Sequence, residues 1–195
     1  MIKSDREIIG KELIKAVLDM MHTVHLGFAG EEYPYVVPLN FGYEYQEDLI
    51  IYIHCRRDGG YKLKLLEKNP RVCATFSDFR NYPDLMYKGH RHDYRSVMAF
   101  GEASEVTDKK EFARGLRLLL EHNHRKPGQF KADDVPKLRI LKIVCPADQV
   151  FGKSEFPVRT VEDVPFADPY SRPYDETPYD ISDLEAREKR PSRFE

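Results

Sequence analysis

The sequence predicts a mainly β protein, an antiparallel β-barrel with accessory helices, and three observations lead to this prediction. About five or six segments are rich in β-branched and aromatic residues, which favour strands. Candidate helices are few, and they do not alternate with the strands as a parallel sheet requires. Polar and glycine-containing turns separate neighbouring strands, as in antiparallel barrels.

The first elements are predicted as follows, from the N-terminus onward. Ser4 and Asp5 are good helix-capping residues, and apolar residues at helical spacing after them predict a helix as far as Met20. Pro38 has no backbone N–H to donate, so we expect its strand to be bulged or to lie at a sheet edge. The strands in this half of the chain are predicted over 23–28, 33–45 and 49–54.

The second half of the chain continues with two helices and three strands. A short helix is predicted over 60–68, because Asn69-Pro70 ends it. Gly101 is expected at a bulge or at a close approach of two backbones. Asp108 begins a capping-box pattern that opens the other helix. The strands are predicted over 71–76, 95–106 and 138–144.

Length and composition limit the number of domains and the partners. The 195 residues suggest one barrel domain over 1–154 and a proline-rich C-terminal extension or arm over 155–195. The formal net charge of -2 gives no reason to expect nucleic acid. The charged N-terminus and the lack of a long apolar run predict neither a leader peptide nor a membrane span. An odd number of cysteines, 3, favours buried thiols in a reducing cytoplasm.

The segment HCRRDGGYKLKLLEKNP, residues 54–70, places anion-binding groups between a strand and a helix. Free backbone N–H groups at a helix N-terminus bind phosphate, and Lys62 lies in the first helical turn. Arg56 and Arg57 can add charge-assisted hydrogen bonds. The alternative is a solvated turn, with glycine for the bend and arginine for solubility. These residues alone leave both interpretations open.

The segment ADQVFGKS, residues 147–154, is similar to the phosphate-binding loop of nucleotide hydrolases. That loop needs its first glycine and a helix directly after the Lys-Ser pair. Here alanine replaces the glycine, and Pro157 follows where the helix should run. The sequence therefore does not favour a nucleotide hydrolase.

Histidine and cysteine patterns leave two further alternatives. The His-x-His pairs at 90–92 and 122–124 could supply zinc ligands, although a zinc site needs three or four ligands on rigid elements. His54 and Cys55 are neighbours in a predicted strand, where adjacent side chains point to opposite faces. A Cys-His dyad between them is therefore not expected, and we predict no metal site.

Three stretches together resemble the FMN-binding split-barrel family related to pyridoxamine 5′-phosphate oxidase, and within it the nitroimidazole-resistance (Nim-type) flavoproteins. The strand PYVVPLNF at 34–41 and the segment IYIHCRRDGGYKLKLLEKNPRVC at 51–73 are similar to two motifs of that branch. YRSVMAFGEASEV at 94–106 is similar to a third. The resemblance covers about residues 23–153.

The resemblance implies a split barrel of Greek-key type that forms a homodimer, with FMN bound at the subunit interface. It implies three groups of cofactor-binding residues: along the isoalloxazine ring and ribityl chain, Val37, Pro38, Leu39 and Asn40; toward the phosphate, His54, Cys55, Arg56 and Lys62; and elsewhere near the cofactor, Tyr94, Ser96 and Val97.

The chain also departs from the oxidase. Where the oxidase has Ser-Arg-Lys before its helix, this sequence has Gly60-Tyr61-Lys62, so we expect Arg56 or Arg57 to substitute at the phosphate. No counterpart of the oxidase's arginine-rich substrate site occurs near the C-terminus. Vitamin B6 oxidation is therefore not the first expectation, and the insertion at 80–93 and the extension are expected to shape a different substrate pocket.

These observations leave three hypotheses for the function. The first is an FMN-dependent oxidoreductase that transfers electrons from a reduced nicotinamide donor to a small electrophile, of the nitro compound or quinone type. The second is a protein that carries flavin, haem or a deazaflavin with little turnover, with a pyridoxamine 5′-phosphate oxidase-like enzyme as a further variant. The third is a metal-dependent hydrolase or a nucleotide hydrolase. Under the first, the cofactor supplies the redox chemistry, and no catalytic acid or base is assigned.

Overall fold

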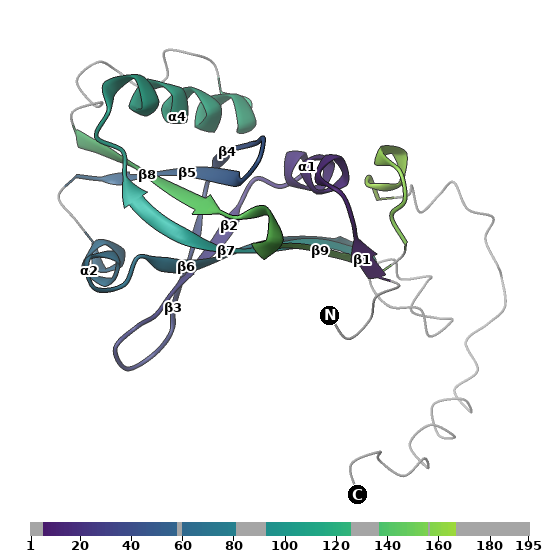
Figure 1. Ribbon diagram of the computed structural model, residues 1–195, viewed down its shortest axis with the longest axis horizontal. Helices are drawn as coiled ribbons and strands as arrows, with labels where there is room; N and C mark the ends of the chain where they lie inside the picture. Colours follow the sequence, from purple (N-terminus) through teal and green to yellow (C-terminus); the bar gives the residue numbers. More distant parts are fainter. Residues whose placement is uncertain (1–5, 58–59, 81–92, 126–136, 156, 167–195) are drawn as a thin grey trace, which may run out of the picture.

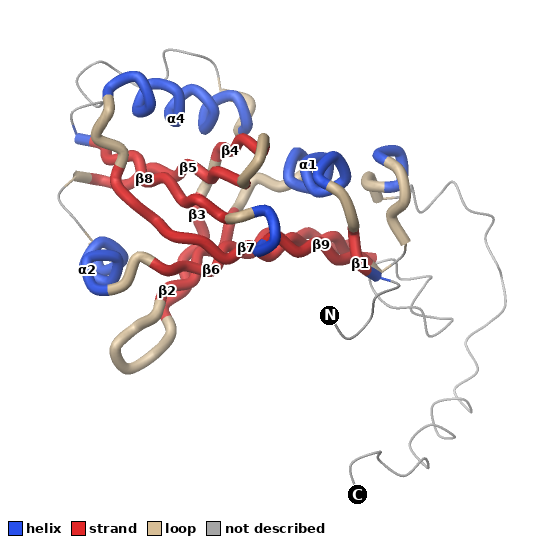
Figure 2. Tube along the Cα trace, viewed as in Figure 1, coloured by secondary structure: helices blue, strands red, loops and turns tan. Residues whose placement is uncertain are grey.

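An antiparallel sheet forms the centre of the protein, and helices lie around it (Figures 1 and 2). The computed structural model describes residues 6–57, 60–80, 93–125, 137–155 and 157–166. Within these residues the sheet has nine strands, in the order β3-β2-β6-β7-β8-β5-β4, and β9 joins β7 to β1. The strands are β1 (Glu7–Ile8), β2 (Val24–Phe28), β3 (Tyr35–Leu39), β4 (Gly42–Tyr45), β5 (Leu49–Arg56), β6 (Arg71–Arg80), β7 (Asp93–Glu105), β8 (Leu138–Cys145) and β9 (Val150–Ser154).

The two edges of the sheet path, β3 and β4, follow each other directly in the chain. Only Asn40 and Phe41 separate them, so the sheet must curl back toward itself while the path between its edges stays open. This arrangement is a split barrel, which confirms the predicted fold class. Pro38 lies in edge strand β3, as predicted from its missing donor.

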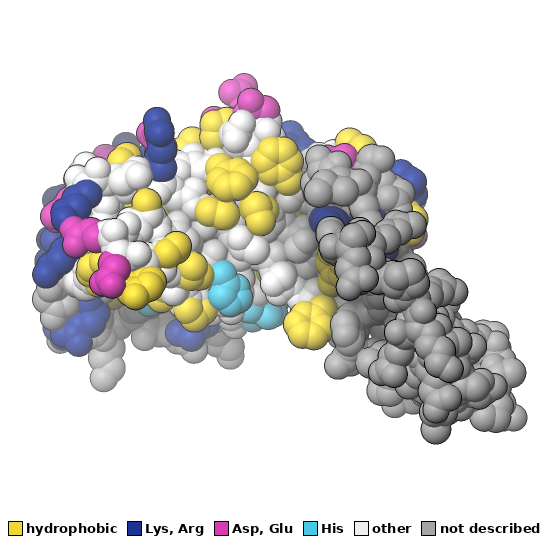
Figure 3. All heavy atoms as spheres, turned by 90° about the horizontal axis from the view of Figure 1, so that it is seen from below, with side chains coloured by type: hydrophobic (Ala, Val, Ile, Leu, Met, Phe, Trp, Pro, Cys, Tyr) yellow, Lys and Arg dark blue, Asp and Glu magenta, His cyan; other side chains and the backbone are white. Residues whose placement is uncertain are grey.

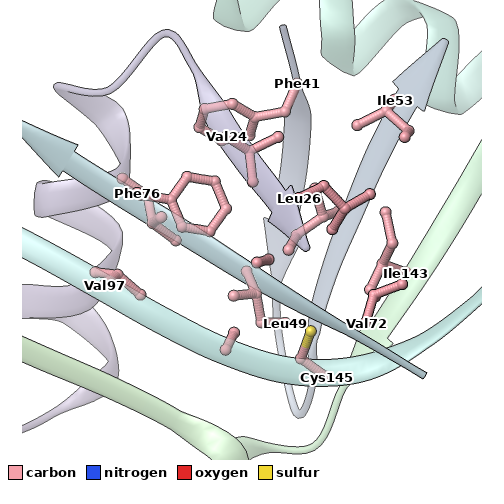
Figure 4. Close-up of a cluster of buried hydrophobic side chains, with 14 of the residues drawn as sticks. Val24, Leu26, Phe41, Leu49, Ile53, Val72, Phe76, Val97, Ile143 and Cys145 are labelled. Atoms are coloured by element: carbon pink, nitrogen blue, oxygen red, sulfur yellow. The ribbon is translucent and has the colours of Figure 1, made fainter. Parts of the chain in front are cut away.

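The core lies on the inner face of the curled sheet. Along β2 the residues alternate between buried and more exposed, so Val24 and Leu26 point inward. Figure 4 shows these side chains with those of the facing strands. The rings of Phe41 and Phe76 meet edge to face, with centroids 4.7 Å apart. Each large apolar side chain that is fully buried here contributes about 1.5–3 kcal/mol.

Three α-helices are described: α1 (Lys11–Asp19), α2 (Tyr61–Lys68) and α4 (Lys109–His122), with short 3₁₀ helices η3 (Ala147–Gln149) and η4 (Val161–Asp163). Helix α4 packs on β4, β5 and β8, above them in Figure 1. Its Gly115 lies so close to Tyr52 that a Cβ atom would come within 2.7 Å of the ring. The Asp108 side chain accepts a hydrogen bond from the Glu111 N–H at 2.8 Å, which confirms the predicted start of this helix.

The N-terminal helix begins later than predicted. Residues Glu7–Ile8 pair with β9 as a short strand, and the chain then bends at Gly10, whose φ is 110°. Helix α1 therefore starts at Lys11, because the strand pairing uses the residues that the capping pattern assigned to the helix. The prediction from Ser4 and Asp5 was wrong about the start, and these two residues lie outside the described part.

The segment similar to a phosphate-binding loop forms η3 and strand β9, with no helix after the Lys-Ser pair. Beyond it, Val158 and Val164 are buried in the core. The buried guanidinium of Arg95 pairs with Asp93 and donates hydrogen bonds to the carbonyls of Val164 (3.0 Å) and Asp163 (3.1 Å). The first residues of the predicted extension thus pack on the barrel, and residues 167–195 lie outside the described part.

Candidate functional site

The end of β5 and the start of α2 form a corner of the barrel. His54 is half-buried and Arg56 is exposed at the end of the strand. Helix α2 starts after Gly60, whose φ of 143° is a conformation that favours glycine, and no side chain caps this helix end. A Cβ atom on Gly60 would lie 3.9 Å from the Lys62 Nζ atom. The ammonium group of Lys62 therefore lies beside an uncapped helix N-terminus.

Positive charge gathers around His54 in this corner. The pKa of His54 is lowered first by burial, and then by the charges of Arg125 and Lys62. Burial raises the pKa of the neighbouring Cys55 thiol, while Lys62 and Arg139 oppose that rise. Within the described part of the chain, neither Lys62 nor Arg125 forms an ion pair with a carboxylate. The corner is thus basic and suited to an anion.

Asn40 connects the β3–β4 junction to the end of α4. Its Nδ2 amide donates hydrogen bonds to the His22 carbonyl and to the Asn123 Oδ1 atom, both at 3.1 Å. Asn123 ends α4, and its own Nδ2 atom donates to the Phe41 carbonyl at 2.9 Å. The β3–β4 junction and the end of α4 are therefore fixed to each other.

The other residues predicted along β3 point to two different faces. Val37 and Leu39 pack against the core, whereas Pro38 is exposed on the outer face of the sheet. A ligand lying on the outer face could contact the Pro38 ring directly. It could contact Val37 and Leu39 only through backbone atoms, because their side chains point inward.

Three of the predicted cofactor-binding residues, Tyr94, Ser96 and Val97, lie on β7. Val97 is fully buried in the core, and Tyr94 is half-buried. The Ser96 hydroxyl donates a hydrogen bond to the Lys153 carbonyl of β9 at 3.4 Å. The predicted residues therefore lie in separate places: His54, Cys55, Arg56 and Lys62 at the corner, Asn40 against the end of α4, and Tyr94, Ser96 and Val97 beside β9.

The outer face of the sheet carries a row of side chains across five strands, with apolar residues at both ends of the row. In the sheet register, Pro38 pairs with His25, His25 with Thr75, Thr75 with Met98, and Met98 with Phe151. Because directly paired residues point to the same face, these side chains form one row on the surface. Figure 3 views the molecule from below, and hydrophobic side chains gather over the middle of this face.

A second row on the same face contains Val36 and Phe100, which are 58% and 43% exposed. Phe100 and Phe151 meet edge to face, with ring centroids 6.3 Å apart. Beside them lies a cleft of about 530 Å³, lined by both residues of the second row and by the thiol-bearing Cys73. Adjacent exposed apolar residues of this size are typical of a surface that binds a partner or a flat ligand.

Arg125, whose charge contributes to the lowered pKa of His54, was not predicted from the sequence. The Arg125 N–H donates to the Leu120 carbonyl at 2.9 Å, in a turn that no residue pattern predicted.

Of the two His-x-His pairs, the one at 90–92 lies outside the described residues. The described residues contain no group of three or more histidine, cysteine or acidic side chains that could hold a metal ion. None of the described helices is both long and apolar enough to cross a membrane.

Residues 11–145 match the family of pyridoxamine 5′-phosphate oxidase. No curated protein matches the chain. Among solved structures, a candidate 5-nitroimidazole antibiotic resistance protein from Bacteroides thetaiotaomicron has 26% identity and a TM-score of 0.63, over 76% of this chain and 86% of that one.

Two more distant structures have the same fold. The flavocytochrome Anf3 from Azotobacter vinelandii has 21% identity and a TM-score of 0.57, over 92% of this chain and 91% of that chain. The FAD and heme binding protein from Mycobacterium smegmatis has 17% identity and a TM-score of 0.59, over 92% and 96% respectively. At these identities the likeness concerns the fold alone.

Proposed function

Because the chain belongs to the pyridoxamine 5′-phosphate oxidase family, we propose that it is a flavoprotein that binds FMN by its phosphate at the basic corner. The observation that carries this proposal is the position of Lys62. Its ammonium group lies beside the uncapped N-terminus of α2 and has no carboxylate partner in the described residues. Such a set of donors and cations fits a phosphate dianion.

Each part of the corner has a role in this proposal. Lys62 and the first N–H groups of α2 bind the phosphate, and the half-buried His54 contributes a hydrogen bond. Asn40, fixed by Asn123, holds the β3–β4 junction where the ribityl chain would enter. Pro38 and the outer apolar face accept the flat ring. Bound flavin would supply the electron-transfer chemistry, and the protein would position it and exclude water.

The proposal includes a homodimer with the flavin at its interface. Within one chain, Lys62 lies at the start of α2, whereas Tyr94 and Ser96 lie on β7 beside β9. A second copy that covers the outer apolar face would bring its own β7 to the corner of the first copy. Val36 and Phe100 are exposed in the single chain and would then be buried at the interface. Apolar residues at the centre of a stable dimer interface are usually buried in this way.

The reaction that we propose is electron transfer from a reduced nicotinamide to a small electrophile, of the nitro compound or quinone type. The likeness to the candidate nitroimidazole resistance protein, at 26% identity, supports this acceptor class. The alternative is a flavin-carrying protein without turnover. Both descriptions share the same flavin site, and only turnover distinguishes them.

The test is the visible spectrum of the purified protein, followed by mass spectrometry of the compound released on denaturation. We expect the absorption of oxidised flavin and the mass of FMN. Release of FAD would correct the cofactor, and a colourless protein that takes up no flavin would contradict the proposal. Anaerobic bleaching by NADH or NADPH and recovery of colour on adding a nitroaromatic would support the enzyme. Without bleaching, the carrier is the better description.

A further inference from the structure

Gly27 lies in the middle of β2 without the reason that explains the other strand glycines. A Cβ atom on Gly42, Gly101 or Gly152 would come within 2.4 Å of a neighbouring atom, so these positions have no room for a side chain. A Cβ atom on Gly27 would meet nothing closer than the Cys73 carbonyl oxygen at 3.5 Å, an ordinary contact, and the φ of Gly27 is not positive. Glycine inside a strand costs stability, so without these constraints it indicates a place where a ligand or another chain approaches the backbone.

The missing side chain of Gly27 forms the floor of the cleft on the outer face. Gly27 pairs with Val36 on one side and with Cys73 on the other, and Cys73 pairs with Phe100. Directly paired residues point to the same face, so Val36 and the ring of Phe100 stand as walls on either side of two small residues. The cleft of about 530 Å³ is lined by all four, and its size is typical of a site for one small molecule.

Two charged side chains stand at one end of the cleft. Arg71 pairs with Glu102 in the register, and both residues line the cleft. The Arg71 Nε atom lies 3.8 Å from the Glu102 Oε1 atom, and both side chains are largely exposed. Such an exposed pair contributes little, so the guanidinium can turn to an oxygen atom of a ligand. Because the Glu102 carboxylate repels an anion at this place, the ligand that fits is uncharged, flat and apolar, with oxygen atoms at one end.

The cleft adjoins the surface proposed for the flavin ring. On the same face, Pro38 and His25 lie two residues along their strands from Val36 and Gly27. The rise of a strand separates these two rows by about 7 Å. A molecule in the cleft would therefore lie beside a ring that rests on Pro38, which is where an electron acceptor must lie.

We propose that the cleft over Gly27 is the binding site of the electron acceptor, an uncharged planar aromatic compound with oxygen atoms at one end. Its ring lies between Val36 and Phe100, and its oxygen atoms face Arg71. This inference rests on the proposed function and gives the acceptor a place on the chain. In the proposed dimer, the second copy packs on the exposed walls and closes the cleft over the ligand.

Calorimetric titration of the purified, oxidised protein without an electron donor measures binding apart from turnover. The probes are nitrobenzene and benzoate, which have the same planar shape and differ in charge. Nitrobenzene should bind about tenfold more tightly than benzoate. Gly27→Leu should weaken nitrobenzene binding about tenfold or more, because the leucine side chain fills the cleft. Arg71→Ala should weaken it about threefold to tenfold, the usual loss for one hydrogen bond.

Gly27→Ala separates a ligand-binding role of this glycine from a structural one. Its methyl group fits at contact distance, so the melting temperature should rise, while nitrobenzene affinity should fall by less than about threefold. Gly152→Ala is the matched control. A Cβ atom there would lie 2.8 Å from the Ile8 Cβ atom, so this variant should have a lower melting temperature and unchanged nitrobenzene affinity.

Arg117→Ala is the control for Arg71→Ala. Arg117 is an exposed arginine on α4 that lies 4.0 Å from Glu121, and its loss should leave nitrobenzene affinity unchanged. Equal affinities of the Arg71→Ala and Arg117→Ala variants would overturn the contact between Arg71 and the ligand.

The outcomes separate the cleft from the proposed function. If the purified protein contains FMN and Gly27→Leu binds nitrobenzene as tightly as the wild type, the proposed function stands and the cleft is not the acceptor site. If Gly27→Leu separates the dimer in sedimentation, the second copy itself fills the cleft, which also overturns the inference. A lower melting temperature of Gly27→Ala would make the glycine structural, with the same consequence. A colourless wild type that takes up no flavin overturns the proposed function, and the acceptor role of the cleft with it.

Discussion

Asn40 and Asn123, which are distant in the sequence, are joined by a hydrogen bond of 3.1 Å from the Asn40 Nδ2 atom to the Asn123 Oδ1 atom. Asn40 directly follows β3, and Asn123 ends helix α4. The contact therefore fixes the β3–β4 junction, where the ribityl chain is proposed to enter, to the end of α4.

Asn123→Ala tests this connection. The variant loses the hydrogen bonds to Asn40 and to the Phe41 and Leu119 carbonyls. We expect the free energy of unfolding to fall by about 1–3 kcal/mol, because the partners of a half-buried amide lose their bonds. Urea denaturation measures this. In a double-mutant cycle with Asn40→Ala, we expect a coupling of about 0.5–1.5 kcal/mol, and strictly additive losses would argue against the connection.

Lys62→Ala should weaken FMN retention about tenfold or more, because its ammonium group lies beside the start of α2. Retention is measured by gel filtration of the reconstituted protein and by the flavin absorption of the protein peak. Lys64→Ala is the matched control, since Lys64 is an exposed lysine on the same helix. Equal retention by the two variants would show that the phosphate does not bind at Lys62.

Met98→Asp tests the proposed dimer. A carboxylate at this position, opposite Phe151 on the outer face, cannot be buried against a second copy without a large desolvation penalty. Sedimentation should give twice the chain mass of 22.9 kDa for the wild type and a single chain mass for the variant. Val161→Asp, on η4 and away from this face, should leave the dimer intact. A monomeric wild type would refute the dimer.

Stability should fall on mild acidification. Burial and the nearby His22 and His124 lower the pKa of His122, although the Met21 carbonyl and Asp19 oppose this. Below its ordinary value of 6.5, the unfolded chain therefore binds more protons at this residue than the folded chain does. The free energy of unfolding should decrease from about pH 6.5 downward.

The lowered pKa of His54 contributes with the same sign. Chemical denaturation at about pH 7.5 and about pH 5.5 measures the effect. His122→Gln keeps a donor toward the Met21 carbonyl but cannot titrate, so the variant should lose less stability than the wild type over this range. An identical loss in both proteins would exclude His122 as a source of the pH dependence.

Two local rules predicted parts of the fold well. Proline cannot donate in a sheet, so Pro38 could be assigned to an edge or bulge before the sheet order was known, and β3 is an edge strand. Glycine within a strand indicates a close approach, and a Cβ atom on Gly101 would lie 2.3 Å from the Val144 carbonyl oxygen. Both rules depend on backbone chemistry that holds in any fold.

Other features depend on contacts between distant segments, which the residue pattern does not contain. Strand β9 forms because it pairs with β7 and β1, although its sequence is similar to a phosphate-binding loop. Arg125 was missed because the usual sign of a left-handed helix end is glycine, and His124 stands there instead. Asn40, His54 and Lys62 could be expected together only from the resemblance to a known family.

A crystal structure of the protein with FMN tests the central claim most directly. We expect the flavin phosphate within about 2.7–3.2 Å of the Lys62 Nζ atom, at the N-terminus of α2. Phosphate bound at any other place on the barrel, with the Lys62 side chain directed into solvent, would contradict this account.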